Sequence, residues 1–227
     1  GFGCDDYTLG LEAAGALLGY ARLTQGQAIT HVHGMRVYAA EHYVRMDAAT
    51  RRNLEITQTL RGEPAPTLLS LLDTCASNMG SRLLNHWLHH PLRERTILRA
   101  RLDAVENLSA CWREVYEQIK PCVDVERICA RIALHSARPR DLSGLRDTLG
   151  QLPQLHGMLH GNASRLVAEL AAAVLPEQAL TILLQRTLRA EPSTVLRDGG
   201  VIADGFDAEL DELRGIQTNC GDFLLAL

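Results

Sequence analysis

The sequence is poor in the residues that several classes of protein require. Lys120 is the only lysine, and Ile119 and Pro121 flank it, so no phosphate-binding loop of the Gly-Lys-Ser/Thr type exists in these residues. Aromatic residues make up only 4% of the chain, which disfavours strands and favours packed helices rich in Leu and Ala. The formal net charge of −4 argues against sequence-independent nucleic-acid binding, which normally needs a basic excess.

Paired cysteines and long apolar runs are also missing. The six cysteines are dispersed without a Cys-x-x-Cys pair, and 227 residues can fold without covalent cross-links, so we expect reduced thiols in a cytosolic protein. The longest apolar runs fall far below the ~20 residues of a membrane-spanning helix, so no membrane partner is expected. Length alone allows one domain or two.

Both ends of the sequence have the character of cuts. The chain begins at Gly1 without an initiator methionine, and it stops at Leu227 inside an amphipathic pattern. The final residues contain no glycine, proline or basic last turn of the kind that ends helices. We therefore expect an expressed fragment of a longer protein.

Apolar residues recur every three or four positions along most of the chain, which is the spacing of amphipathic helices. The clearest stripe, from Leu98 to Ile119, predicts one helix of about six turns. Asp47 is expected to cap a helix that runs to about Leu60, in which Arg51 and Glu55 form an i,i+4 pair. Further helices are predicted at 11–25, 68–72, 79–88, 125–132, 142–152, 166–174, 180–188 and 206–227.

Two segments interrupt this helical spacing. Val37-Tyr38 and Tyr43–Met46 predict short strands or an extended linker. The Asp198-Gly199 step lies between short apolar runs and predicts a small hairpin or an extended loop. The predicted fold class is therefore all-α, a multi-helix arrangement with at most minor short β segments.

Ten short motifs appear in one characteristic order. They are MDAATRRNLEI at 46–56, LLSLLDT at 68–74, MGSRLL at 79–84, WL at 87–88, PL at 91–92, RLDAV at 101–105, DVER at 124–127, PRDL at 139–142, RDGGVI at 197–202 and GFDAELDELR at 205–214. Together they resemble the core (lever) domain of MutS, the DNA mismatch-repair family, from about residue 12 to the end. One motif would be weak support, but this number in family order is specific.

By position, the resemblance implies that residues 1–29 are the last part of a connector domain. Residues 30–206 then correspond to the first part of the core domain, and 207–227 to the start of the lever helix that leads to a clamp. In the family this region transmits conformational change between bound nucleotide and DNA. The resemblance therefore implies a structural coupling role, with no catalytic site and no cofactor in these residues.

The same resemblance describes the parent protein. It implies a homodimeric, DNA-dependent ATPase that uses ATP and magnesium, binds mismatched duplex DNA through other domains, and works in the bacterial cytosol at the nucleoid. The residues here match neither the mismatch-reading segment nor the ATPase. Without its returning partner helix, the apolar stripe of residues 207–227 is expected either to fray or to pair with another copy of the chain.

Histidines are the first candidate ligands for a metal. His86 and His90 lie one turn apart, with His89 beside them, which is a spacing that can hold a metal ion. Carboxylates are lacking nearby, and Pro91 places these histidines in the last helical turn, where they favour the negative end of the helix dipole. His31 and His33 are expected in a loop. We predict no metal site.

Other candidates have simpler structural interpretations. Cys122 and Cys129 are two helical turns apart and are expected to lie on one apolar face as small hydrophobes. Gly199-Gly200 indicates a turn rather than a phosphate loop. Arg138–Asp141 and Arg51-Arg52 could offer cations to DNA phosphate, but an internal ion pair or a helix cap is favoured. No catalytic or cofactor-binding residue is predicted, and DNA-binding residues stay unknown.

Three alternatives remain open from the sequence. The chain could be a stand-alone helical module that binds a partner protein. It could be an enzyme with a metal bound at His86–His90. Within the family, it could be the core of a paralogue that acts in recombination. The mismatch-reading segment, which would distinguish a repair protein from such a paralogue, is not among these residues.

Overall fold

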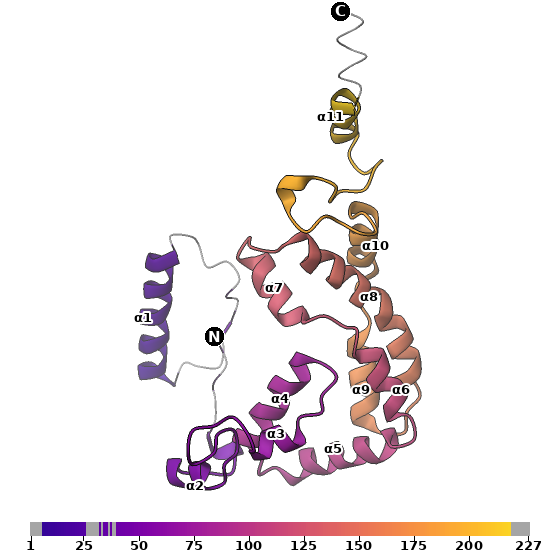
Figure 1. Ribbon diagram of the computed structural model, residues 1–227. Helices are drawn as coiled ribbons and strands as arrows, with labels where there is room; N and C mark the ends of the chain where they lie inside the picture. Colours follow the sequence, from indigo (N-terminus) through magenta and orange to yellow (C-terminus); the bar gives the residue numbers. More distant parts are fainter. Residues whose placement is uncertain (1–5, 26–31, 33, 36, 38–39, 219–227) are drawn as a thin grey trace, which may run out of the picture. The chain divides into compact units, whose positions relative to one another are not determined.

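The computed structural model describes residues 6–25, 32, 34–35, 37 and 40–218, and this part of the chain is helical (Figure 1). It contains no β-strand, only isolated antiparallel bridges at Tyr43–Leu92 and Leu188–Ile202, which confirms the all-α prediction. The helices are α1 (Thr8–Gln25), α2 (Ala48–Asn53), α3 (Leu68–Leu72), α4 (Asn78–His89), α5 (Arg95–Leu108), α6 (Trp112–Ile119), α7 (Val125–Ala133), α8 (Pro139–Leu159), α9 (Arg165–Val174), α10 (Gln178–Thr187) and α11 (Ala208–Thr218), with 3-10 turns η1 (Ala40–His42) and η2 (Leu196–Asp198).

The chain divides into two compact units. Unit 1 comprises residues 1–99 and 129–136, and unit 2 comprises residues 100–128 and 137–227. The boundaries at residues 99/100 and 128/129 fall within α5 and α7. The domain limits predicted at residues 29 and 206 stay predictions.

In unit 1, α2 is shorter than predicted. Asp47 does cap it, because its carboxylate accepts a hydrogen bond of 2.6 Å from the backbone N–H of Thr50. The helix ends at Asn53, and Glu55 adopts φ 46°, in the left-handed region. The carboxylate of Glu55 then accepts from the backbone N–H of Leu60 at 2.6 Å. The predicted helix to Leu60 and the predicted Arg51–Glu55 pair are therefore wrong.

The turn at Glu55 has a packing reason. It brings Ile56 into the interior, where 3% of this residue is exposed, and it ties the chain to the start of α3. The carbonyl of Glu55 accepts from the N–H of Leu68 at 3.1 Å, and that of Ile56 accepts from Leu69 at 2.9 Å. Burying one isoleucine contributes about 1.5–3 kcal/mol, more than a further turn of exposed helix would. By contrast, α1 has no buried residue within the described structure.

The long helix predicted from Leu98 to Ile119 is two helices. It breaks at Ser109, whose hydroxyl donates to the carbonyl of Glu106 at 2.7 Å and so competes with the helical ladder. Leu102 and Val105 of the predicted stripe are each 68% exposed, and the buried residue of α5 is Ala104. The small side chain of Ala104 permits close packing, which periodicity of large apolar residues did not indicate.

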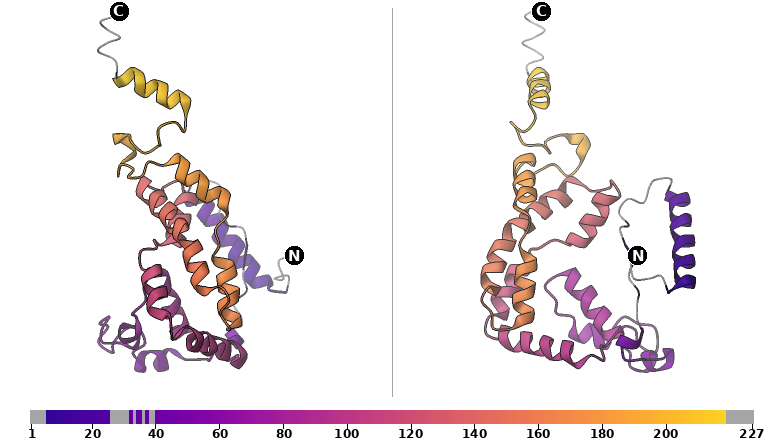
Figure 2. Two further views of the ribbon diagram at one scale, coloured as in Figure 1. Left: turned by 90° about the vertical axis from the view of Figure 1, so that its right-hand side faces the viewer. Right: turned by 180° about the vertical axis from the view of Figure 1, so that it is seen from behind.

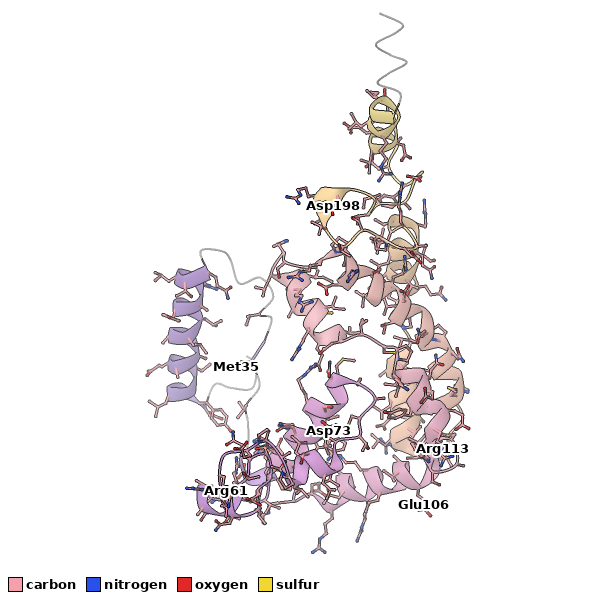
Figure 3. All side chains as sticks on the ribbon, viewed as in Figure 1. Met35, Arg61, Asp73, Glu106, Arg113 and Asp198 are labelled. Carbon is pink, nitrogen blue, oxygen red and sulfur yellow. The ribbon has the colours of Figure 1, made fainter. Side chains whose placement is uncertain are left out.

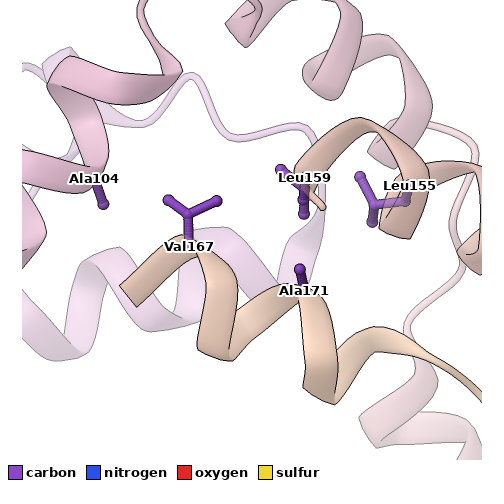
Figure 4. Packing of buried hydrophobic residues seen from close by; sticks show 5 residues of the cluster. All are labelled: Ala104, Leu155, Leu159, Val167 and Ala171. Atoms are coloured by element: carbon purple, nitrogen blue, oxygen red, sulfur yellow. The ribbon is translucent and has the colours of Figure 1, made fainter. Parts of the chain in front are cut away.

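In unit 2, α8 is the central helix. It begins with Pro139 in its first turn and packs against α6, α9 and α10, with α9 running beside it in both views of Figure 2. One core cluster joins Leu155 and Leu159 of α8 to Val167 and Ala171 of α9 (Figure 4). A second cluster joins α8 to α7 through Leu145, Leu149 and Ile128.

The helix α8 also continues through a proline. Pro153 lacks the N–H that would bond to the preceding turn, which normally costs about 3 kcal/mol. Leu149 on one side of Pro153 and Leu155 on the other are both buried in the core clusters. Their packing offsets the lost hydrogen bond, so the helix spans both clusters.

Among the described residues no single helix is long and apolar enough to span a membrane. Only α9 and α10 taken together, with a bend of 42° between them, reach that length and apolarity.

Candidate functional site: the junction between α8 and α11

The candidate site in unit 2 is the junction that connects the packed helices to α11. The end of α10 lies antiparallel to the segment that precedes α11, with the bridge at Leu188 and Ile202. Here the N–H of Arg189 donates to the carbonyl of Val201 at 3.0 Å, and the N–H of Ala203 donates to Thr187 at 2.8 Å. Leu188 and Val201 are both buried. The bridge is therefore held by backbone bonds and by apolar packing.

Arg146 fastens this bridge to α8. Its Nη1 donates to the carbonyl of Arg189 at 2.7 Å and its Nη2 donates to the carbonyl of Ala190 at 2.9 Å. Its Nε donates to the carboxylate of Asp147 at 2.8 Å. The side chain of Arg146 is only 13% exposed. A guanidinium that donates in fixed directions from a nearly buried position holds its acceptors more strongly than a neutral donor does.

Asp204 connects the bridge to α11. Its Oδ1 accepts from Nη2 of Arg189 at 2.6 Å and from Nη1 of Arg214 at 2.9 Å, and Nη2 of Arg214 also donates to the carbonyl of Ile202 at 3.0 Å. The hydrogen bond from Arg189, together with the positive charges of Arg189 and Arg214, lowers the pKa of Asp204 below its usual value. Because the Asp204 side chain is 71% exposed, solvent screens these pairs, and they orient α11 more than they stabilise it.

The first turn of α11 is fixed from its own side as well. The carboxylate of Asp207 accepts from the backbone N–H of Leu210 at 3.0 Å, and that of Asp211 accepts from the N–H of Gly205 at 2.7 Å. Gly205 has φ +80°, a conformation that side-chain-bearing residues rarely adopt. Acidic groups in the first turn, Glu209 and Asp211, also complement the helix dipole. Residues 219–227 of the predicted 206–227 helix lie outside the described residues.

The predicted histidines form aromatic contacts and hydrogen bonds. The rings of His86, in the last turn of α4, and His90, directly after that helix, stack at 4.5 Å, and the ring of Tyr43 meets that of His90 edge-on at 5.6 Å. Nε2 of His89 lies 3.3 Å from the hydroxyl of Thr57. No set of three possible metal ligands occurs in the part of the chain that is described. His31 and His33 lie outside it.

The other candidates divide into confirmed and wrong predictions. Asp141 caps α8, because its carboxylate accepts from the backbone N–H of Arg138 at 2.9 Å. Gly199 and Gly200, with φ 70° and 68°, form a turn as predicted, although it follows a 3-10 turn and no hairpin closes there. The prediction for Cys129 is wrong. It is exposed, whereas Ile128 occupies the buried face of α7, and Cys122 lies before that helix.

Sequence reasoning did not find Arg146, Arg189 or Arg214. Their partners include backbone carbonyls as well as carboxylates, and Arg189 lies 43 positions beyond Arg146, so no local spacing indicates the contact between them. The one available signal was the almost exclusive use of arginine as the cation, since arginine suits forked internal contacts. That signal names a residue type but no position.

Comparison with protein families gives the identity of this region. The family model for MutS domain III matches residues 49–225, well over half of the chain, and so includes all the arginines of the junction. The helical architecture agrees with that match. The chain therefore belongs to the MutS family of DNA mismatch-repair proteins, and residues 49–225 are its domain III.

Proposed function

We propose that this region is the core and lever of a mismatch-repair ATPase, which couples the binding of mismatched DNA to the nucleotide state of the protein. In this proposal the residues described here supply no catalytic group and no cofactor ligand. The parent, a cytosolic homodimer, would bind mismatched duplex DNA and use ATP with magnesium through its other domains.

The observation that carries the proposal is the unbroken set of contacts from α8 to α11. Arg146 holds the end of α10, the bridge at Leu188 holds the following segment, and Arg214 draws α11 to that segment. In this proposal, a displacement of α11 is therefore transmitted to α8 through these contacts. Conformational coupling over long distances relies on such rigid helices joined by discrete polar contacts.

The proposal is tested in the parent protein with one variant and one matched control. Arg214→Met removes the contacts to Asp204, Asp211 and Ile202. Arg165→Met is the control, because it removes an ion pair of 2.7 Å to Glu169 on the exposed face of α9. The measured quantity is the ratio of affinities for mismatched DNA with and without ATP, from fluorescence anisotropy.

We expect Arg214→Met to bring that ratio about 2- to 30-fold closer to one, which is the range of 0.5–2 kcal/mol by which single residues alter coupling. Affinity for DNA without nucleotide should stay within about twofold, because the junction contacts no DNA in this proposal. Arg165→Met should leave the ratio unchanged. An unaltered ratio in Arg214→Met would refute a coupling role for the junction.

A further inference from the structure

Unit 1 contains a polar pocket of about 420 Å³ that the coupling role does not use. It lies among the C-terminal half of α2, the turn that follows Ile56, and the end of α4. Its polar lining comes from six side chains, those of Arg51, Arg52, Thr57, Gln58, Thr59 and His89. A volume of this size is in the range that holds a small molecule.

Arg51 has an unsatisfied donor at this pocket. Its Nε is buried and has no hydrogen-bond partner among the described residues. A buried N–H of a charged group that lacks an acceptor is unfavourable, and such groups are rare without a bound ion or water. Asp47 lines the neighbouring pocket, which Arg51 and His89 also line, but its carboxylate already caps α2 through Thr50. Among the described residues, no hydrogen bond therefore supplies Nε of Arg51 with an acceptor.

Donors outnumber acceptors around the pocket, and no carboxylate lines it. The hydroxyl oxygen of Thr59 accepts from the N–H of Glu63 at 3.0 Å, which leaves its own hydrogen free to donate. Burial lowers the pKa of His89, and the positive charges of Arg51 and His90 lower it further, as expected in an environment that is already positive.

The ligand that best matches this set is a phosphate group. A carboxylate offers two oxygens and one charge, whereas a phosphate monoester offers three free oxygens and close to two charges at neutral pH. Two guanidinium groups and a hydroxyl therefore suit the phosphate better. We propose that the pocket binds a phosphate monoester or inorganic phosphate, with Arg51 and Arg52 as charge partners and Thr59 as a neutral donor.

The test uses the full 227-residue chain and inorganic phosphate, titrated at constant ionic strength with sodium chloride as the balancing salt. Two-dimensional ¹H–¹⁵N NMR follows the Nε–H signal of Arg51 directly, so binding at another place on the surface is distinguished. Arg61→Met is the matched control. Arg61 (labelled in Figure 3) is an exposed arginine in the loop between α2 and α3, and it does not line the pocket.

We expect a saturable shift of the Arg51 Nε–H signal with phosphate and a weaker response with acetate. Arg51→Met and Arg52→Met should each weaken phosphate binding by about tenfold or more, as followed through backbone amides of residues 57–62, and Arg61→Met by less than about twofold. Well-dispersed spectra would show that each variant is folded. Absence of saturation, or equal affinity in both Arg51→Met and Arg61→Met, would overturn the proposal. Tighter binding of an oligonucleotide, which carries only phosphodiesters, would also overturn it.

Discussion

The packing of the segment before α7 against α8 can be tested with two glycines of one helix. A Cβ added at Gly144 would lie 2.8 Å from Cγ1 of Val123, whereas a Cβ added at Gly150 would meet no atom within 4 Å. Both glycines lie in the interior of α8, so replacement by alanine removes the same helix penalty, about 1 kcal/mol. The two variants therefore differ mainly in the contact with Val123.

Val123 has little freedom to move away. Its backbone N–H donates to the hydroxyl of Thr148 on α8 at 3.0 Å, and Thr148 is 3% exposed. A β-branched side chain also has few alternative rotamers. Overpacking of this kind costs about 1–3 kcal/mol. We expect Gly150→Ala to raise the free energy of unfolding by about 0.5–1 kcal/mol, and Gly144→Ala to be about 1–3 kcal/mol less stable than Gly150→Ala.

The assay is urea unfolding followed by tryptophan fluorescence. Trp87→Phe leaves Trp112, at the start of α6 in unit 2, as the single reporter. Unchanged m-values would show that differences between the urea midpoints of the variants reflect differences in their free energy of unfolding. Adding Val123→Ala to Gly144→Ala should relieve most of the overpacking, so the two changes should not be additive. Equal stability of Gly144→Ala and Gly150→Ala would refute the described contact.

Three further predictions concern the isolated chain. Calorimetric titration with ATP and magnesium should show no binding in the micromolar range, because Gly-Lys-Ser/Thr is absent, and stoichiometric micromolar binding would contradict this. Fluorescence anisotropy at about 150 mM salt should show no preference for mismatched over matched duplex; a tenfold preference, about 1.4 kcal/mol, would count against the account. Leu213 and Ile216 of α11 are exposed, so replacement of Ile216 and Phe223 by glutamate should abolish any dimer in light scattering, and a persistent dimer must use another surface.

Local sequence signals predicted the parts of the fold that depend on neighbouring residues. Asp47 at the start of α2 and Asp141 in the first turn of α8 both act as caps, as their positions indicated. The helical spacing also gave the fold class. These features follow from residues within a few positions of one another, which a sequence displays directly.

Features that depend on distant packing were not predictable in the same way. The left-handed turn at Glu55 exists because Ile56 is buried. The break at Ser109 divides into α5 and α6 a segment that apolar periodicity predicted as one helix. The junction depends on Arg146 meeting carbonyls more than forty positions away. Apolar spacing cannot indicate which backbone carbonyl a given arginine will reach.

The central claim is that the junction makes α8 and α11 move as one body. Spin labels carried on unnatural amino acids at Gln154 of α8 and Glu212 of α11, both exposed, leave the six native cysteines in place. Pulsed electron spin resonance then measures the distribution of distances between the labels, with unlabelled chain added in excess to suppress contacts between copies. The account predicts one narrow distribution that broadens in Arg214→Met and not in Arg165→Met. A distribution that is already broad in the unaltered chain, or one that Arg214→Met leaves unchanged, would contradict it.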